Sequence, residues 1–258
     1  MRAPVLVLCA HGTDDPDGRG TTLAIADAAR YRLPGVVVRD AYVDVQRPTL
    51  DEVVDALVAA GERVVIVPLL LTLGYHVEVD VAAAVARHPG AVASSGPLGP
   101  HEALVDVLME RLHATEVHYR TPVVLGVAGS SRAEAAVVAH AVGEALAERW
   151  PGPVTVGFLA ASSPTVEDAV AEARACSSRG RVAVASYLVG RGYFQRRLEA
   201  SGGDVTTAPL GDHPRLVDVV VERYLAACRE LWQQAVPLSP AVARSTVAPI
   251  GGDTWPIR

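Results

Sequence analysis

The chain has few aromatic residues and no long apolar run, and each scarcity excludes a class of protein. Aromatic residues make up 5% of the 258 residues, although 50% are hydrophobic, so the apolar side chains are mainly small and aliphatic. This composition suits parallel strands that are covered by helices on both faces. No apolar stretch reaches the roughly 20 residues of a membrane-spanning helix, and the first residues lack a signal-peptide pattern. We therefore expect a soluble protein without a membrane partner.

Cysteine and positive charge are also scarce. Cys9, Cys176 and Cys228 lie far apart and form no C-x-x-C motif, which argues against a disulfide framework or a structural zinc site. Unpaired cysteines are typical of the reducing cytoplasm, where we expect the protein to reside. The net charge of −6 argues against a nucleic-acid partner. The glycines form neither a dinucleotide-binding nor a Walker motif.

The sequence contains an internal duplication. Four motifs, at residues 5–13, 42–49, 73–76 and 97–101, recur in the same order at residues 122–130, 158–165, 191–194 and 209–213. A repeat of this length indicates two similar structural units. We predict an N-terminal domain over residues 1–117, which carries the metal site, and a degenerate repeat domain over residues 121–233. Residues 236–258 are rich in Pro, Ser and Gly, and they predict a flexible tail.

Within each half, short apolar strands alternate with amphipathic helices. The first half has candidate strands at residues 5–9, 36–42, 64–70 and 91–93, and Thr49 with Glu52 forms a capping box at the start of a helix. Alternation of this kind predicts an α/β fold: two similar doubly wound domains, each with a four-stranded parallel sheet flanked by helices.

Three polar residues follow successive strands of the first half: His11, Asp44 and His76. Ligands of open α/β sheets bind at the carboxyl ends of the strands, so these side chains are expected at one edge. Two imidazoles and a carboxylate suit Fe²⁺ or Co²⁺, and a neutral imidazole can also act as a base near neutral pH.

The second half provides an internal control for this site. Ala128, Ala160 and Phe194 stand where His11, Asp44 and His76 stand in the first half, in an otherwise similar scaffold. If folding required the three polar residues, the second half would need them too. The comparison therefore favours a functional role for them.

Other polar residues favour a structural interpretation. Both halves keep a histidine just before their last helix, His101 and His213, which indicates capping or loop fixing. Glu78 and Asp80 lie in the first turn of a predicted helix, where acidic residues are favoured by the helix dipole, although a supporting role beside the metal is an alternative.

The motifs around these residues resemble those of the sirohydrochlorin chelatases, the ATP-independent class II enzymes that insert iron or cobalt into sirohydrochlorin. The resemblance lies in His-Gly-Thr at residues 11–13, Tyr-Val-Asp at 42–44, Pro-Thr-Leu at 48–50 and the segment 67–81, and extends over most of the chain to about residue 232. It implies the long form of the family, in which a short homodimeric ancestor is duplicated and fused. A monomer or a dimer is compatible with this form.

The resemblance also implies roles for particular residues. His11 and His76 are the expected catalytic residues, and with Asp44 they are the expected metal site, although the family usually has Glu where this chain has Asp44. The metal is Fe²⁺, giving siroheme, or Co²⁺, and it is a substrate, so we expect no permanently bound cofactor. The polycarboxylate ring requires cationic or amide donors. The candidate substrate-binding residues are Arg47, Ser130, Arg132, Arg191 and Arg196, with Arg197 beside them.

Three alternatives remain open. The first is a mononuclear iron oxygenase with two histidines and one carboxylate, although such sites usually occur in β-barrels. The second is a metal or tetrapyrrole carrier without enzymatic activity. The third is a protoporphyrin ferrochelatase, which shares the architecture but whose motifs we do not find. The sequence does not distinguish iron from cobalt or nickel.

Overall fold

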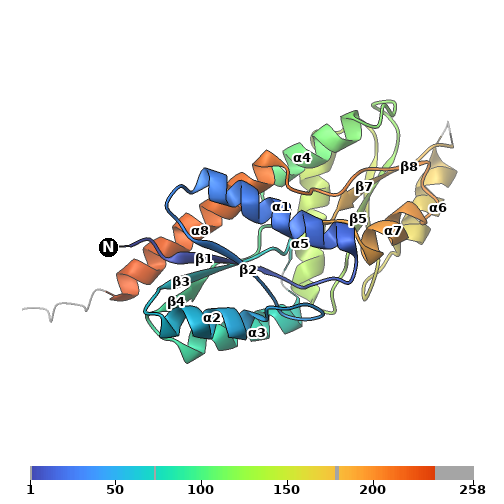
Figure 1. Cartoon of the computed structure of the whole chain (residues 1–258). Helices are drawn as coiled ribbons and strands as arrows, with labels where there is room; N and C mark the ends of the chain where they lie inside the picture. Colours follow the sequence, from blue (N-terminus) through green and yellow to red (C-terminus); the bar gives the residue numbers. More distant parts are fainter. Residues whose placement is uncertain (1, 73, 178–179, 236–258) are drawn as a thin grey trace, which may run out of the picture.

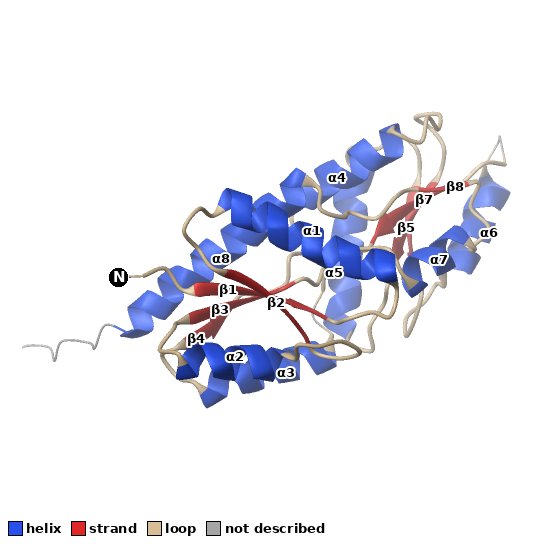
Figure 2. Ribbon diagram, viewed as in Figure 1, coloured by secondary structure: helices blue, strands red, loops and turns tan. Residues whose placement is uncertain are grey.

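The computed structural model describes residues 2–72, 74–177 and 180–235. It contains two four-stranded parallel sheets, each with helices on its faces (Figures 1 and 2). This arrangement confirms the predicted α/β class and the duplication of the sheet. The predicted tail at residues 236–258 lies outside the described residues.

Each half runs strand, helix, strand, helix, as its hydrophobic pattern predicts. The first half consists of β1 (Val5–Ala10), α1 (Pro16–Arg32), β2 (Val38–Tyr42), α2 (Leu50–Ala59), β3 (Val64–Pro68), α3 (Tyr75–Arg87), β4 (Val92–Ser94) and α4 (Glu102–His113). The second half consists of β5 (Val123–Val127), α5 (Ala133–Ala147), β6 (Val154–Phe158), α6 (Val166–Cys176), β7 (Ala183–Tyr187), α7 (Tyr193–Glu199), β8 (Val205–Thr206) and α8 (Pro214–Ala235).

The two sheets have the same strand order. The first is β2-β1-β3-β4 and the second is β6-β5-β7-β8, with all pairs parallel. The central strands β1 and β5 are buried along their whole length, because helices cover both faces. In both sheets the chain passes from the first strand to the neighbour on one side and then returns across it to the neighbour on the other side. This reversal lies at the carboxyl ends of β1 and β5, where ligands bind in such folds.

Helix starts follow the predicted capping chemistry. Thr49 caps α2 in a full capping box, in which its hydroxyl accepts from the Glu52 N–H and the Glu52 carboxylate accepts from the Thr49 N–H. In the second half Thr165 likewise accepts from the Asp168 N–H, but the shorter Asp168 carboxylate contacts the Thr165 hydroxyl, at 2.7 Å. The repeat thus conserves the cap and loses the reciprocal bond.

The last helices of the two halves are exchanged. Helix α4 packs against α5 and β7 of the second half, whereas α8 packs against α1, β3 and β4 of the first half (Figure 1). The largest hydrophobic cluster accordingly joins side chains from both halves, including Leu8, Leu108, Leu125 and Val220. Each sheet is therefore covered by a helix of the other repeat, and the two repeats share one core.

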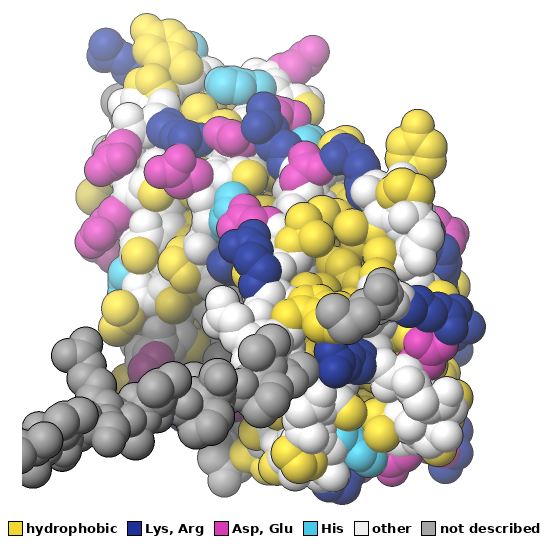
Figure 3. Space-filling model, turned by 90° about the vertical axis from the view of Figure 1, so that its left-hand side faces the viewer, with side chains coloured by type: hydrophobic (Ala, Val, Ile, Leu, Met, Phe, Trp, Pro, Cys, Tyr) yellow, Lys and Arg dark blue, Asp and Glu magenta, His cyan; other side chains and the backbone are white. Residues whose placement is uncertain are grey.

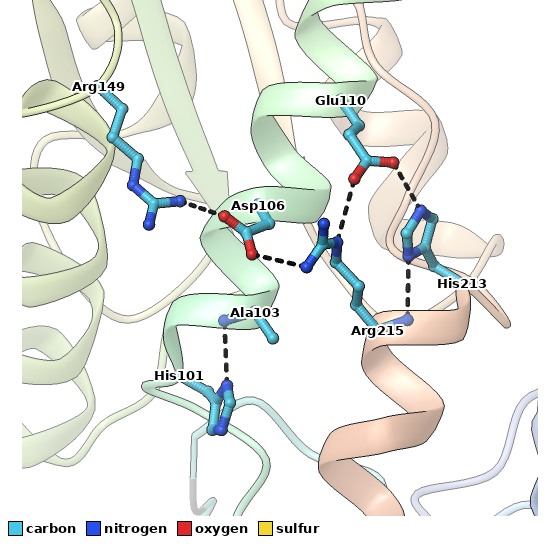
Figure 4. Close-up of polar contacts among 7 residues, drawn as sticks. All are labelled: His101, Ala103, Asp106, Glu110, Arg149, His213 and Arg215. Carbon is cyan, nitrogen blue, oxygen red and sulfur yellow. Dashed lines mark hydrogen bonds and ion pairs between the residues drawn. The ribbon is translucent and has the colours of Figure 1, made fainter. Parts of the chain in front are cut away.

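The exchanged helices are fixed by matching histidines. His101 caps α4, because its Nδ1 accepts from the Ala103 N–H at 3.1 Å, while its Nε2 lies 3.2 Å from the Glu222 carboxylate of α8. His213 repeats this arrangement in front of α8: its Nδ1 accepts from the Arg215 N–H, and its Nε2 lies 3.0 Å from the Glu110 carboxylate of α4 (Figure 4). The predicted structural role of both histidines is confirmed.

Arginines extend the same contact. Arg215 reaches back to α4, with Nε 3.1 Å from Glu110 and a terminal nitrogen 3.0 Å from Asp106 (Figure 4). Asp106 also pairs with Arg149, which follows α5. This network ties the last helix of each repeat to the other repeat.

Stability should depend on the ionisation of Glu110. The hydrogen bond from His213, followed by that from Arg215, holds the pKa of Glu110 below its ordinary value near 4.5. A lowered folded-state pKa contributes stability above the unfolded-state pKa, and this contribution is lost as the pH falls through the folded-state pKa. Because the pair is exposed, we expect Glu110→Gln to lower the Tm by only a few degrees at pH 7.

The pH dependence distinguishes this effect from a simple loss of packing. The Tm difference between wild type and Glu110→Gln should shrink as the pH falls below about 4.5. Thermal denaturation at pH 7, 5 and 3.5 measures it, with Glu172→Gln on the exposed side of α6 as the control. A Tm difference that stays constant over this range would contradict the assignment.

The surface carries charges of both signs. On the face shown in Figure 3, basic and acidic side chains are interspersed among apolar ones. In the part of the chain that the structure describes, no helix combines the length and the apolar character needed to span a bilayer.

Candidate functional site

A cleft of about 780 Å³ lies between the two halves, at the carboxyl ends of both central strands. Its walls are largely apolar and come from both repeats, with Leu69 and Leu71 on one side and Val127, Phe158 and Tyr187 on the other. Its charged lining residues are His11, Asp14, Asp15, Arg191 and Arg196. A slot with apolar walls and a charged rim fits a flat, apolar ring that carries ionised substituents.

His11 lies in this cleft immediately after β1, and its side chain is exposed. Its carbonyl oxygen accepts from the Asp44 N–H at 3.0 Å, which joins the loop after β1 to the loop after β2. The next residue, Gly12, has φ +99°, and a Cβ there would lie 2.2 Å from the Asp44 carbonyl oxygen. The loop that presents His11 therefore requires glycine at residue 12.

Asp44 lies beside this loop, but its side chain is not among those that line the cleft. Its Oδ1 accepts from the Val45 N–H at 2.7 Å, and its carbonyl oxygen accepts from the Gln46 N–H. Val45, with φ +59°, completes this tight turn and itself lines the cleft. The exposed carboxylate is thus close to the His11 loop through the backbone, with one oxygen held by a backbone N–H.

The second half reproduces this backbone without the polar side chains. Gly129 has φ +84°, and a Cβ there would lie 1.9 Å from the Ala160 carbonyl oxygen. Ala161 has φ +59°, as Val45 has. Ala128 occupies the place of His11 and lines the opposite wall. The scaffold is thus kept in both repeats, and the imidazole is present in one.

His76 is the second residue of α3, two positions after the cleft-lining N-cap residue Gly74. Its side chain lies outside the described part of the structure, so the predicted grouping of His11, Asp44 and His76 stays a prediction. Among the side chains that are described, no cluster of three or more His, Cys, Asp or Glu residues could hold a metal ion.

The predicted substrate-binding residues divide into two groups. Ser130, Arg191 and Arg196 line the cleft. Arg47 does not: its side chain is 80% exposed and pairs with Glu52 on α2. Arg132 lies next to the lining residue Ser131 and pairs with Glu78 of α3.

Arg197 is directed away from the cleft. It donates to the Leu159 carbonyl oxygen at 2.7 Å and lies 3.7 Å from the Glu167 carboxylate. These contacts hold the loop after β6 against α7.

Sequence reasoning missed two residues that shape the cleft. Asp15 caps α1, and the hydrogen bond from Arg196 is the main cause that lowers the pKa of its carboxyl. An acidic residue directly before a proline is a helix-start signal that could have identified this cap. Gln46 accepts from the Thr13 N–H at 2.7 Å and so ties the loops after β1 and β2 together. No local pattern predicts that contact.

Comparison with known proteins gives relatives in one family. The CbiX family model matches residues 5–115 and 122–227. A sirohydrochlorin ferrochelatase of Priestia megaterium is 26% identical over 204 residues, which cover 76% of each chain. A sirohydrochlorin cobaltochelatase of the same organism is 24% identical over 202 residues, which cover 73% of this chain and 65% of that protein.

A solved structure shares the fold. SirB from Bacillus subtilis with Fe³⁺ superposes with a TM-score of 0.77 at 19% identity, over 90% of this chain and 98% of that one. Together with the sequence relatives, this likeness confirms the resemblance to the two-domain sirohydrochlorin chelatases. Since the family model matches most of both halves, the chain belongs to the CbiX family.

Proposed function

We propose that this protein is a sirohydrochlorin chelatase, a lyase that inserts a divalent metal ion into the tetrapyrrole. Fe²⁺ is the first candidate for the metal and Co²⁺ the second, since one relative is named a ferrochelatase and another a cobaltochelatase. The observation that carries the proposal is the position of His11: an exposed imidazole at the carboxyl end of a central strand, in a cleft large enough for a small organic ligand.

The two repeats would have different roles in catalysis. The first supplies the imidazole of His11, with His76 and Asp44 as its proposed partners. The second supplies Ala128 in place of the histidine, aromatic wall residues such as Phe158, and the arginines Arg191 and Arg196. A flat ring between these walls would face metal-handling groups on one side and anion-binding groups on the other.

Metal insertion requires the loss of two pyrrole protons and the transfer of a divalent ion into the ring. A neutral imidazole can accept a proton near neutral pH or hold the metal as a ligand, and two imidazoles at one edge could do both. Few protein ligands are expected, because the metal must be released into the ring. The exposure of His11 suits such a transient role.

The proposal is tested by insertion of Fe²⁺ and Co²⁺ into sirohydrochlorin, followed by absorbance under anaerobic conditions. The expected result is a rate above that of the spontaneous reaction, with turnover. Tight retention of the metallated ring after a single stoichiometric conversion would favour a carrier. A rate equal to the spontaneous one would refute the enzyme.

Asp44 provides a test within the proposed site. Asp44→Glu should retain metal insertion within about threefold of wild type, because the longer carboxylate can still serve the site and the exposed position tolerates one more methylene. Asp44→Ala should lower the rate by about tenfold or more if the carboxylate takes part. A folded but inactive Asp44→Glu protein would show that the carboxylate has a more tightly constrained role.

A further inference from the structure

Two ion pairs join the first half of the chain to the second beside the cleft. Asp15, before α1, pairs with Arg196 of α7, and Glu78 of α3 pairs with Arg132, before α5. Figure 1 shows α1 extending to α7. The close approach of Gly18 to the backbone of Arg191 indicates that this side of the cleft is tightly packed.

The four residues occupy matching positions of the repeat. Asp15 and Arg132 are the N-cap residues of α1 and α5. Glu78 and Arg196 are each the fourth residue of their helices, α3 and α7. One contact, between an N-cap residue and the third helix of the other repeat, therefore occurs twice, once in each direction between the repeats.

The N-cap residue is acidic in one copy of this contact, at Asp15, and basic in the other, at Arg132. In both pairs the carboxylate comes from the first half and the guanidinium from the second. The cleft lining follows the same division, with Asp14 and Asp15 from the first half and Arg191 and Arg196 from the second. The sequence contains no lysine, so these cations are all arginines, whose planar geometry suits carboxylates.

We propose that Asp15 and Glu78 hold Arg196 and Arg132 in place as internal substitutes for substrate carboxylates, which exchange with them when the ring enters the cleft. This inference rests on the proposed function. Partly exposed ion pairs are weak, so such an exchange costs little free energy. The side chains of Arg132 and Arg196 are 34% and 62% exposed, which leaves both guanidiniums accessible to an incoming anion.

The exchange also has a consequence for the metal. Asp15 and Glu78, once released from their arginines, leave uncompensated negative charge on the half that carries His11. That charge attracts a divalent cation toward the cleft. Because the two pairs are separate contacts, Asp15 with α7 and Glu78 with the start of α5, a ring with carboxylates around its whole periphery would release both, and a ring with carboxylates along one edge would release one.

The test measures binding of uroporphyrin, an octacarboxylate porphyrin, by fluorescence titration of the full chain. Asp15→Asn retains an N-capping oxygen while it removes the charge. We expect it to tighten binding about two- to fivefold, the range that corresponds to a partly exposed ion pair. Glu78→Gln should act similarly, and the effects of the two substitutions should multiply.

Matched variants separate the exchange from a general change in charge. Asp14→Asn removes the same charge from the cleft, but Asp14 lies 3.6 Å from Arg19 of its own half, so it should have clearly less effect. Arg196→Gln should weaken binding, and in that background Asp15→Asn should have no further effect. Protoporphyrin, with its carboxylates on one edge, should respond less to the double substitution than uroporphyrin.

The outcomes distinguish the two proposals. If wild type binds uroporphyrin and inserts metal into sirohydrochlorin, but Asp15→Asn and Glu78→Gln leave binding unchanged or weaken it, the exchange is wrong and the chelatase proposal stands. If wild type neither binds uroporphyrin nor inserts metal, both fail. Thermal denaturation of each variant shows that the protein under test is folded.

Discussion

His11→Ala should lower the rate of metal insertion by about 10²-fold or more, with little change in Tm. Loss of a group that transfers a proton or holds the reacting ion typically costs 10²- to 10⁴-fold. His11 is exposed at the edge of the cleft, so its removal leaves no buried cavity. Initial rates of Fe²⁺ and Co²⁺ insertion, with the spontaneous rate subtracted, measure the effect.

Two further variants sharpen this test. His76→Ala should give a loss of similar size if the two histidines share the task, as the sequence predicts. His88→Ala is the matched control, because His88 also belongs to the first half but pairs with Asp55 away from the cleft lining. Insertion rates within twofold of wild type for both His11→Ala and His76→Ala would refute the proposed site.

Gly12→Ala should lower the free energy of unfolding by about 2 to 4 kcal/mol and strongly reduce metal insertion. A φ of +99° is unfavourable for alanine, and the added Cβ would lie 2.2 Å from the Asp44 carbonyl oxygen. Since a backbone atom cannot rotate away, the loops after β1 and β2 must separate, and His11 moves with them. Chemical denaturation measures the stability and the absorbance assay the activity.

Two other glycines separate the causes. Gly35 has φ +85° and open space around it, so Gly35→Ala should cost only about 1 kcal/mol, the contribution of the backbone conformation. Gly129→Ala introduces the same clash in the second half, against the Ala160 carbonyl oxygen. It should match Gly12→Ala in stability but retain more insertion activity per folded molecule. Equal losses of activity in both variants would argue that the cleft as a whole, and not the His11 loop, was disturbed.

Much of the fold could be predicted because it follows from local patterns. The order of strands and helices appears in the alternation of short apolar runs with helical periodicity, and the observed strands agree with the predicted ones to within a few residues at their ends. The cap at Thr49 follows from the spacing to Glu52. The duplication follows from four motifs in the same order.

The candidate site could be predicted only in part. The position of His11 at a strand end is a local property, and the structure places this residue in the cleft. Arg47 also follows a strand, but its side chain pairs with Glu52 in the first turn of α2 and does not line the cleft. Which side chains of one loop face the cleft depends on the backbone path, and composition does not encode it.

The sequence by itself thus determined the elements, their order, the repeat, and the position of His11 directly after the first central strand. Only the tertiary structure decided that α4 and α8 exchange places and that Asp15 and Glu78 pair with arginines of the other repeat. The physical reason is the range of the interactions. Periodicity and capping act between residues a few positions apart, whereas the exchange and the ion pairs join residues of different repeats, which meet only when the two sheets share one core.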